Sequence, residues 1–321
     1  SSQFKRAVFR GETDADRLDP YVMLYNRLEG WLTGPEVASR LDLIRRSLYL
    51  KAGLPLTRSE VSGEQWRARL LRQLVTGWGW SENTLAELDD RQRWRAEDVT
   101  TLRRTIVNEL THGYRLLSKM AREHGQRAAI SANDINLLGR KLYAAFQRKA
   151  GKIEQINPGL APSLAEENLA FHHQSEQGGD ADGWLLYRDL EDPADAFWQP
   201  VIRRSGNLAE LMVWCYCNGL LTRSTRLNVR SGTSIASVSE LREMLDALSA
   251  FLPFPIAPAE REALSRGVRP LRNLLLVNVG IDPQAHLTEK GLHKLSSRHD
   301  SLGFSGGREN LVISIDQITF N

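Results

Sequence analysis

The spacing of apolar residues changes near Gly151, and this change limits the folds open to the chain. Before Gly151, apolar residues recur at steps of three, four and seven, which buries one face of an α-helix. After Gly151, short apolar and β-branched runs alternate with turn residues, as in strands. The sequence therefore predicts an α+β protein. An all-helical domain is expected over residues 1–150, followed by an α+β domain with a mixed or antiparallel sheet over residues 151–321.

The longest predicted helix runs from Glu97 to His124. Its predicted buried stripe consists of Val99, Leu102, Ile106, Leu110, Leu117 and Met120. The opposite side of this helix carries four cations, Arg104, Arg115, Lys119 and Arg122. Such a row is usually solvated, but it can also attract an acidic protein surface. These four residues are the candidate partner-docking residues.

Other helices are predicted from capping residues. Helix starts are expected at Asp19-Pro20, Gly34-Pro35-Glu36, Thr57–Glu60, Ser131, Asn207 and Ser237. Strands are expected at Ile153 and Ile156, Leu169–Phe171, Trp184–Tyr187, Leu227–Val229, Leu274–Val279 and Leu311–Ile315. Four tryptophans, Trp66, Trp78, Trp80 and Trp94, lie at predicted helix ends. They favour packing between short helices, with a binding platform as the alternative.

Composition indicates a globular protein. Apolar residues make up 41% of the chain and charged residues 25%, and no apolar run approaches the length of a membrane span. The two cysteines, Cys215 and Cys217, are expected to be small buried side chains in a reducing cytoplasm. Because the chain begins without Met and stops just after a strand-like run, both ends are expected to be cuts in a longer protein.

The charge is unevenly distributed. Residues 1–160 hold 27 Lys/Arg against 19 Asp/Glu, whereas residues 161–321 hold 15 against 20. A basic half-chain could bind an acidic or phosphorylated partner, or nucleic acid. A helical surface rich in Arg explains the same charge, because no compact basic run or RNA-binding motif accompanies it. Nucleic-acid binding is therefore kept only as an alternative.

No motif for a metal or a nucleophile stands out. His172 and His173 are neighbours at the end of a predicted strand, so their side chains face opposite ways and would not chelate one ion. His286, His293 and His299 lack ligand spacing with acids or Cys. No Walker A sequence, Gly-x-Gly-x-x-Gly or Gly-x-Ser-x-Gly occurs. We therefore predict no catalytic, cofactor-binding or metal-binding residue in this chain.

Several short sequence motifs resemble those of a known family. They are Leu18-Asp19-Pro20-Tyr21, Arg40-Leu41-Asp42-Leu43-Ile44-Arg45-Arg46, Gly77-Trp78-Gly79-Trp80, Arg140-Lys141-Leu142-Tyr143-Ala144-Ala145-Phe146, Ile156-Asn157-Pro158 and Asn218-Gly219-Leu220-Leu221-Thr222. In this order and spacing the chain resembles the class I adenylate cyclases, bacterial enzymes that make cyclic AMP from ATP. It is similar to the portion that follows their catalytic domain, which resembles nucleotidyltransferases.

The resemblance implies which motif an active site would need. The family's catalytic domain uses Gly-Ser at a helix N-terminus and then Asp-x-Asp, which hold the triphosphate and magnesium ions. Here Ser231-Gly232-Thr233-Ser234 is followed by no Asp-x-Asp. Asp14-Ala15-Asp16 and Asp180-Ala181-Asp182 have no Gly-Ser before them. The fragment alone is therefore predicted to be inactive, with ATP and magnesium bound by the catalytic domain of the parent enzyme.

The resemblance also implies a role. It indicates a cytoplasmic, non-catalytic portion that controls cyclase activity through protein contacts. The implied partners are the enzyme's own catalytic domain and a regulatory protein, in some family members the phosphorylated glucose phosphocarrier of the sugar phosphotransferase system. One alternative is a segment that completes the active site by contacting ATP. The other is the basic nucleic-acid-binding module.

Overall fold

The computed structural model describes residues 2–13, 18–34, 37–57, 65–124, 131–146, 151–157, 159–175, 182–190, 198–232, 234–256, 272–283, 285 and 312–320. Contacts divide the chain into two compact units. The first consists of Ser1–Trp94, Thr101–Gly113 and Leu160–Pro162, and the second of Arg95–Thr100, Tyr114–Gly159 and Ser163–Asn321. Helices precede a mixed sheet with its own helices, which confirms the predicted α+β class. The predicted domain boundary at residue 150 stays a prediction.

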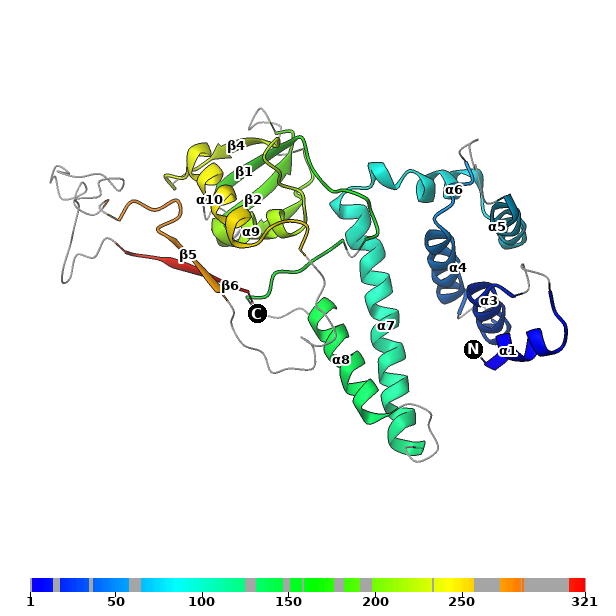
Figure 1. The fold of residues 1–321 in the computed structure, drawn as a ribbon. Coiled ribbons are helices and arrows are strands. Elements are labelled where there is room, and N and C mark those ends of the chain that lie inside the picture. The colour runs from blue at the N-terminus through cyan, green and yellow to red at the C-terminus, as the bar shows by residue number, and fades with distance from the viewer. Residues whose placement is uncertain are drawn as a thin grey trace. The chain divides into compact units, whose positions relative to one another are not determined.

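The first unit is built from short helices (Figure 1). Among the described residues they are α1 (Ser2–Phe9), α3 (Pro20–Trp31), α4 (Ala38–Ala52), α5 (Gln65–Trp78), α6 (Glu82–Asp89) and the short 3₁₀ helix η2 (Arg91–Arg93). The predicted start of α3 is confirmed, because Asp19 Oδ1 accepts hydrogen bonds from the backbone N–H groups of Tyr21 and Val22. Residues 35 and 36 and residues 58–64, on which two further predicted starts depend, lie outside the described residues.

The core of the first unit is lined by tryptophans. Tyr49, Leu71, Val75 and Leu88 form its buried centre, and Trp78, Trp80 and Trp94 pack against them. The rings of Trp78 and Trp80 lie 4.8 Å apart in an edge-on contact. These three tryptophans therefore join short helices, as the packing interpretation predicted. Trp66 differs from them, since it is 37% exposed beneath the Arg67 guanidinium.

Two long helices follow, α7 (Ala96–His124) and α8 (Ala132–Phe146). The C-terminal half of α7 and α8 lie side by side in the second unit (Figure 1). Gly139 allows the close approach, because a Cβ there would lie 2.5 Å from the Tyr114 hydroxyl oxygen. Ser131 caps α8 by accepting a hydrogen bond from the backbone of Asp134, as the sequence predicted.

A four-stranded mixed sheet forms the centre of the second unit. Its order is β3 (Arg203–Ser205), β2 (Gly183–Arg188), β1 (Asn168–Gln174) and β4 (Arg226–Arg230). The β1–β2 and β2–β3 pairs are antiparallel, and β1–β4 is parallel. A separate antiparallel pair joins β5 (Arg272–Val277) and β6 (Ile315–Phe320). The last strand therefore begins where the predicted one ends, and β3 was not predicted.

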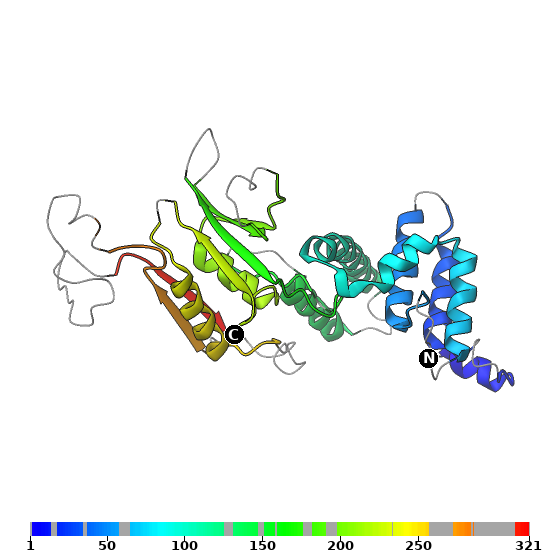
Figure 2. The same cartoon turned by 90° about the horizontal axis from the view of Figure 1, so that it is seen from above.

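Helices α9 (Leu208–Cys217) and α10 (Val238–Phe251) cover one face of the four-stranded sheet (Figures 1 and 2). Phe171 on β1 and Leu186 on β2 are opposite each other in the register and are fully buried. Asn207 and Ser237 cap the two helices, each accepting a hydrogen bond from a backbone N–H three residues on. Both predicted caps are confirmed.

The predicted strand at Ile153 and Ile156 is wrong, because this segment is irregular. Its backbone is bonded to a side chain instead of a neighbouring strand. The Asn218 side chain accepts a hydrogen bond from Ile156 N at 2.6 Å and donates one to Glu154 O at 2.8 Å. Ile156 is buried all the same, at 1% exposure. A side-chain amide thus satisfies the polar groups that a strand partner would have satisfied.

Candidate functional site

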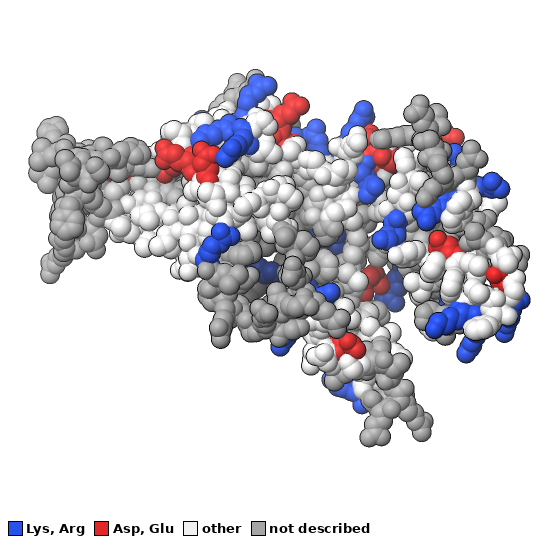
Figure 3. Space-filling model, in the orientation of Figure 1, with Lys and Arg blue, Asp and Glu red and all other residues white. Residues whose placement is uncertain are grey.

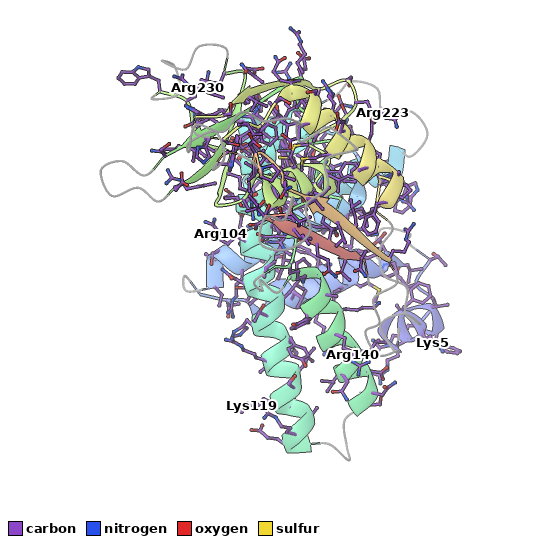
Figure 4. All side chains as sticks on the ribbon, turned by 90° about the vertical axis from the view of Figure 1, so that its left-hand side faces the viewer. Lys5, Arg104, Lys119, Arg140, Arg223 and Arg230 are labelled. Carbon is purple, nitrogen blue, oxygen red and sulfur yellow. The ribbon has the colours of Figure 1, made fainter. Side chains whose placement is uncertain are left out.

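The four predicted docking residues lie on one face of α7. At about 100° per residue, Arg104, Arg115, Lys119 and Arg122 fall within about 60° of one another around the helix axis. All four are exposed. Figure 4 shows Arg104 and Lys119 projecting from the same side of the helix. The face spans about 27 Å between its end residues at about 1.5 Å per residue.

The contacts of this cation face are few and weak. The Lys119 side chain is 68% exposed, and its Nζ lies 3.9 Å from the Glu123 carboxylate. Arg122 Nε donates to the Ser118 carbonyl oxygen at 3.2 Å. Exposed pairs of this kind contribute little to stability, about 0–1 kcal/mol. The cations are therefore available to an incoming anionic group at little cost.

Figure 3 shows how charged residues are distributed on one face of the molecule. On the face shown in Figure 3, Lys and Arg are separated by uncharged and acidic residues and form no continuous basic stripe. Single-stranded or duplex nucleic acid would favour a continuous track of phosphate contacts. This view therefore adds no support to the nucleic-acid alternative.

The predicted apolar stripe of α7 needs correction at two positions. Val99 is fully buried, but Leu110 is 41% exposed and Met120 is 52% exposed. The buried residues in the described part of α7 are Ala96, Val99 and Arg103, which all lie near its N-terminal end. Helical spacing identifies an apolar side, whereas the position of the neighbouring elements decides which part of that side they cover.

The segments that resemble parts of the catalytic motif either make hydrogen bonds and close contacts within the fold or lie outside the described residues. The Ser234 hydroxyl donates to the Gly280 carbonyl oxygen at 2.7 Å and accepts from Ala236 N. The Asp182 carboxylate lies 3.3 Å from His173 Nε2. Residues 14–17 and 176–181 lie outside the described ranges. Within the described residues, no group of three or more His, Cys, Asp or Glu is placed to hold a metal ion.

The two cysteines are free and inert. Cys215 is buried and Cys217 is partly buried. Burial raises the pKa of the Cys217 thiol to about 11 and raises the pKa of Cys215 further. A thiol in this state is a poor nucleophile and a poor metal ligand. Both side chains therefore act as packing residues.

The side chain of His172 points to the face of β1 opposite that of Phe171, because neighbouring residues of a strand alternate. Its neighbours in the register are Leu185 on β2 and Arg230 on β4. Burial lowers the pKa of His172, and the nearby charges of Arg230 and His173 lower it further. Nδ1 of this imidazole is buried and has no hydrogen-bond partner among the described residues. The folded chain therefore favours the neutral imidazole.

Acidification is expected to destabilise the second unit through His172. Below the ordinary pKa of about 6.5, the unfolded chain binds a proton that the folded chain resists. The contribution of His172 to the free energy of unfolding is complete above a pH of about 6.5, and it falls as the pH drops toward the lower pKa of His172 in the folded chain. Thermal unfolding at about pH 7.5 and about pH 5.5 measures the loss. His172→Phe should reduce the difference, whereas His112→Gln, at an exposed position on α7, should keep it. An equal loss in all three proteins would contradict this assignment.

One partly buried ion cluster was not predicted from the sequence. Arg188 binds the Glu166 carboxylate at 2.6 Å and the Glu97 carboxylate at 3.3 Å. These charges raise the pKa of Arg188 against the effect of burial. Glu97 stands in the first turn of α7 and Arg188 ends β2. Because the three residues are far apart in the sequence, no local pattern could have indicated their meeting.

The chain is similar to known proteins along its whole length. Residues 1–157 match the family described as "Adenylate cyclase, class-I, second domain", and residues 164–256 match "Adenylate cyclase, class-I, third domain". The chain is 33% identical to an adenylate cyclase of Yersinia intermedia over 99% of its length. It is 32% identical to that of Escherichia coli K12 over 100% and 31% identical to that of Proteus mirabilis over 99%. No solved structure matches.

These matches cover only part of each relative. The chain spans 37% of the Yersinia protein and 38% of the Escherichia coli protein. None of the helices in the described ranges is both long and apolar enough to span a bilayer. The succession of a helical part and a sheet-containing part agrees in order with the two matched domains. On this combined evidence of two successive domains and full-length similarity, the chain belongs to the class I adenylate cyclase family.

Proposed function

We propose that this chain is a non-catalytic portion of a class I adenylate cyclase and controls the enzyme through protein contacts. The whole enzyme would convert ATP to cyclic AMP and pyrophosphate in the cytoplasm, with magnesium and ATP held by its catalytic domain. The supporting observation is the extent of the similarity. It covers 99–100% of this chain but 37–38% of the cyclases it matches. The chain also lacks the combined motif, Gly-Ser followed by Asp-x-Asp, that the family resemblance requires for catalysis.

The cation face of α7 supports a role in protein contacts. It presents Arg104, Arg115, Lys119 and Arg122 on one side of a single helix, all of them exposed. Clustered charges steer an oppositely charged surface and fix its orientation. The partner proposed for this face is an acidic surface of the enzyme's own catalytic domain. A phosphorylated phosphocarrier protein, which is implied only by the family resemblance, would be attracted to the same positive charges.

Charge reversal on α7 tests the proposal in the full-length enzyme. The double variant Arg115→Glu, Lys119→Glu is expected to change the rate of cyclic AMP formation by about fivefold or more, because it places repulsive charges against an acidic partner. The matched control is Arg69→Glu, Arg72→Glu, two exposed cations on α5. Equal rates for both double variants, with unchanged melting temperatures, would contradict a docking role for α7.

The alternative in which this segment contacts ATP predicts a different result. A photoreactive ATP analogue would then label peptides from these 321 residues in the full-length enzyme, and unlabelled ATP would suppress the labelling. The proposed non-catalytic role predicts labelling confined to the rest of the polypeptide. The same experiment with a wild-type and an α7 charge-reversed enzyme separates loss of ATP binding from loss of docking.

A further inference from the structure

Helix α3 has two apolar sides, and the first unit buries only one of them. Val22 and Tyr25 face the core. Tyr21, Leu24 and Trp31 are 53%, 55% and 73% exposed. Their spacing of three and seven residues places them on one side of the helix. Three large apolar side chains exposed on one side of a short helix form a row rather than scattered single residues, and such rows are found at interaction surfaces.

A hollow opens beside this row. It measures about 350 Å³ and its apolar walls come from three helices: Val22 of α3, Leu48 and Ala52 of α4, and Leu70, Leu71 and Leu74 of α5. Tyr21 belongs both to the exposed row and to the wall of the hollow. Tyr21 therefore joins the exposed row to the hollow. A pocket that adjoins an apolar row can receive bulky anchor side chains, the usual centre of a protein interface.

Cations border this surface. Lys51 and Arg67 line the hollow, and Lys51 Nζ lies 5.6 Å from the centre of the Tyr21 ring. Arg27 lies 5.2 Å from the Trp31 ring. The acid among the lining residues, Asp19, accepts two backbone hydrogen bonds at the start of α3. The surface is thus apolar in the middle and positive at its border, which fits an apolar partner with acidic flanks.

We propose that this surface binds an acidic amphipathic helix from another part of the same cyclase polypeptide. Its apolar residues, spaced three and four apart, would lie along α3 and fill the hollow, with Asp or Glu side chains opposite Lys51, Arg67 and Arg27. In the relatives, more than half of the polypeptide lies outside the matched portion. A tethered segment has a high effective concentration, so a surface of modest size is enough to hold it.

This proposal rests on the proposed membership of a longer cyclase, but its test does not use enzyme activity. In the full-length enzyme, the photo-cross-linking residue p-benzoylphenylalanine replaces Leu24. Irradiation is expected to join this position to one peptide outside residues 1–321 that contains Asp or Glu, within a single polypeptide. Ala52→Trp, which fills the hollow from an exposed position, should lower the yield about fivefold or more. The matched control Ala86→Trp, at an exposed alanine on α6, should leave the yield unchanged.

Ionic strength provides a further test of the proposal. The yield is expected to fall severalfold as the ionic strength rises from about 0.05 M to about 0.5 M, because the flanking charges are screened. Cross-links to a second copy, to a different protein, or to no peptide at all would overturn the proposal. So would equal yields for Ala52→Trp and Ala86→Trp. If α7 charge reversal changes cyclase activity while no cross-link forms, the proposed function stands and this inference alone fails.

Discussion

The isolated 321-residue chain is expected to form no cyclic AMP from ATP with either magnesium or manganese. Attack of the 3′-oxygen on the α-phosphate needs neutralised triphosphate charge and an activated nucleophile, which paired carboxylates and metal ions supply. Of the carboxylates in the two Asp-x-Asp sequences of this chain, the structure describes that of Asp182, which lies 3.3 Å from His173 Nε2. The expected result is product at the level of the no-protein blank, together with no tight ATP binding by calorimetry.

The full-length enzyme, assayed under the same conditions, provides the positive control. A truncation that lacks this segment should change the rate of the remaining enzyme, since the proposed role is control of the catalytic domain. Measurable cyclic AMP from the pure chain would contradict the prediction. If the variant Asp180→Asn, Asp182→Asn abolished that product, the loop before β2 would be an active site.

Val99→Asp is expected to unfold α7 and its surroundings, whereas Leu110→Asp is expected to be tolerated. Val99 is 0% exposed, so the variant would bury an unpaired carboxylate at a cost of about 3 kcal/mol or more. Leu110 is 41% exposed, and a new carboxylate there can remain hydrated at a cost of about 1 kcal/mol or less. Thermal unfolding followed by far-UV circular dichroism compares the two variants directly.

The Leu110 position makes this comparison a test of the structure as well as of the sequence. Helical spacing alone places Leu110 and Val99 on the same buried stripe and predicts that both Asp variants lose much of their stability. In the structure Leu110 is exposed, so only the Val99→Asp variant is expected to lose stability. A similarly large decrease in melting temperature for both variants would mean that α7 is covered along the whole predicted stripe. Val99→Ala serves as the control for packing loss without a buried charge.

Local chemistry made several elements predictable. Asp19, Ser131, Asn207 and Ser237 all cap helices, because each side chain accepts a backbone hydrogen bond at the first turn. The strands β1, β2, β4 and β5 follow short apolar runs, and the exposed cations of α7 follow from spacing along one helix. These features depend on residues a few positions apart, so the sequence alone specifies them.

Contacts between residues far apart in the sequence determined the features that were not predicted. The short strand β3 exists because it pairs with β2, and the segment at Ile156 is irregular because Asn218 supplies its hydrogen bonds. The partly buried ion cluster around Arg188, the exposure of Leu110 and the hollow beside Tyr21 depend likewise on which elements pack together. The sequence by itself therefore determined the capped starts of α3, α8, α9 and α10, the α+β class and the family. Only tertiary packing decided which apolar surfaces are covered, because burial is a property of neighbours that sequence spacing does not contain.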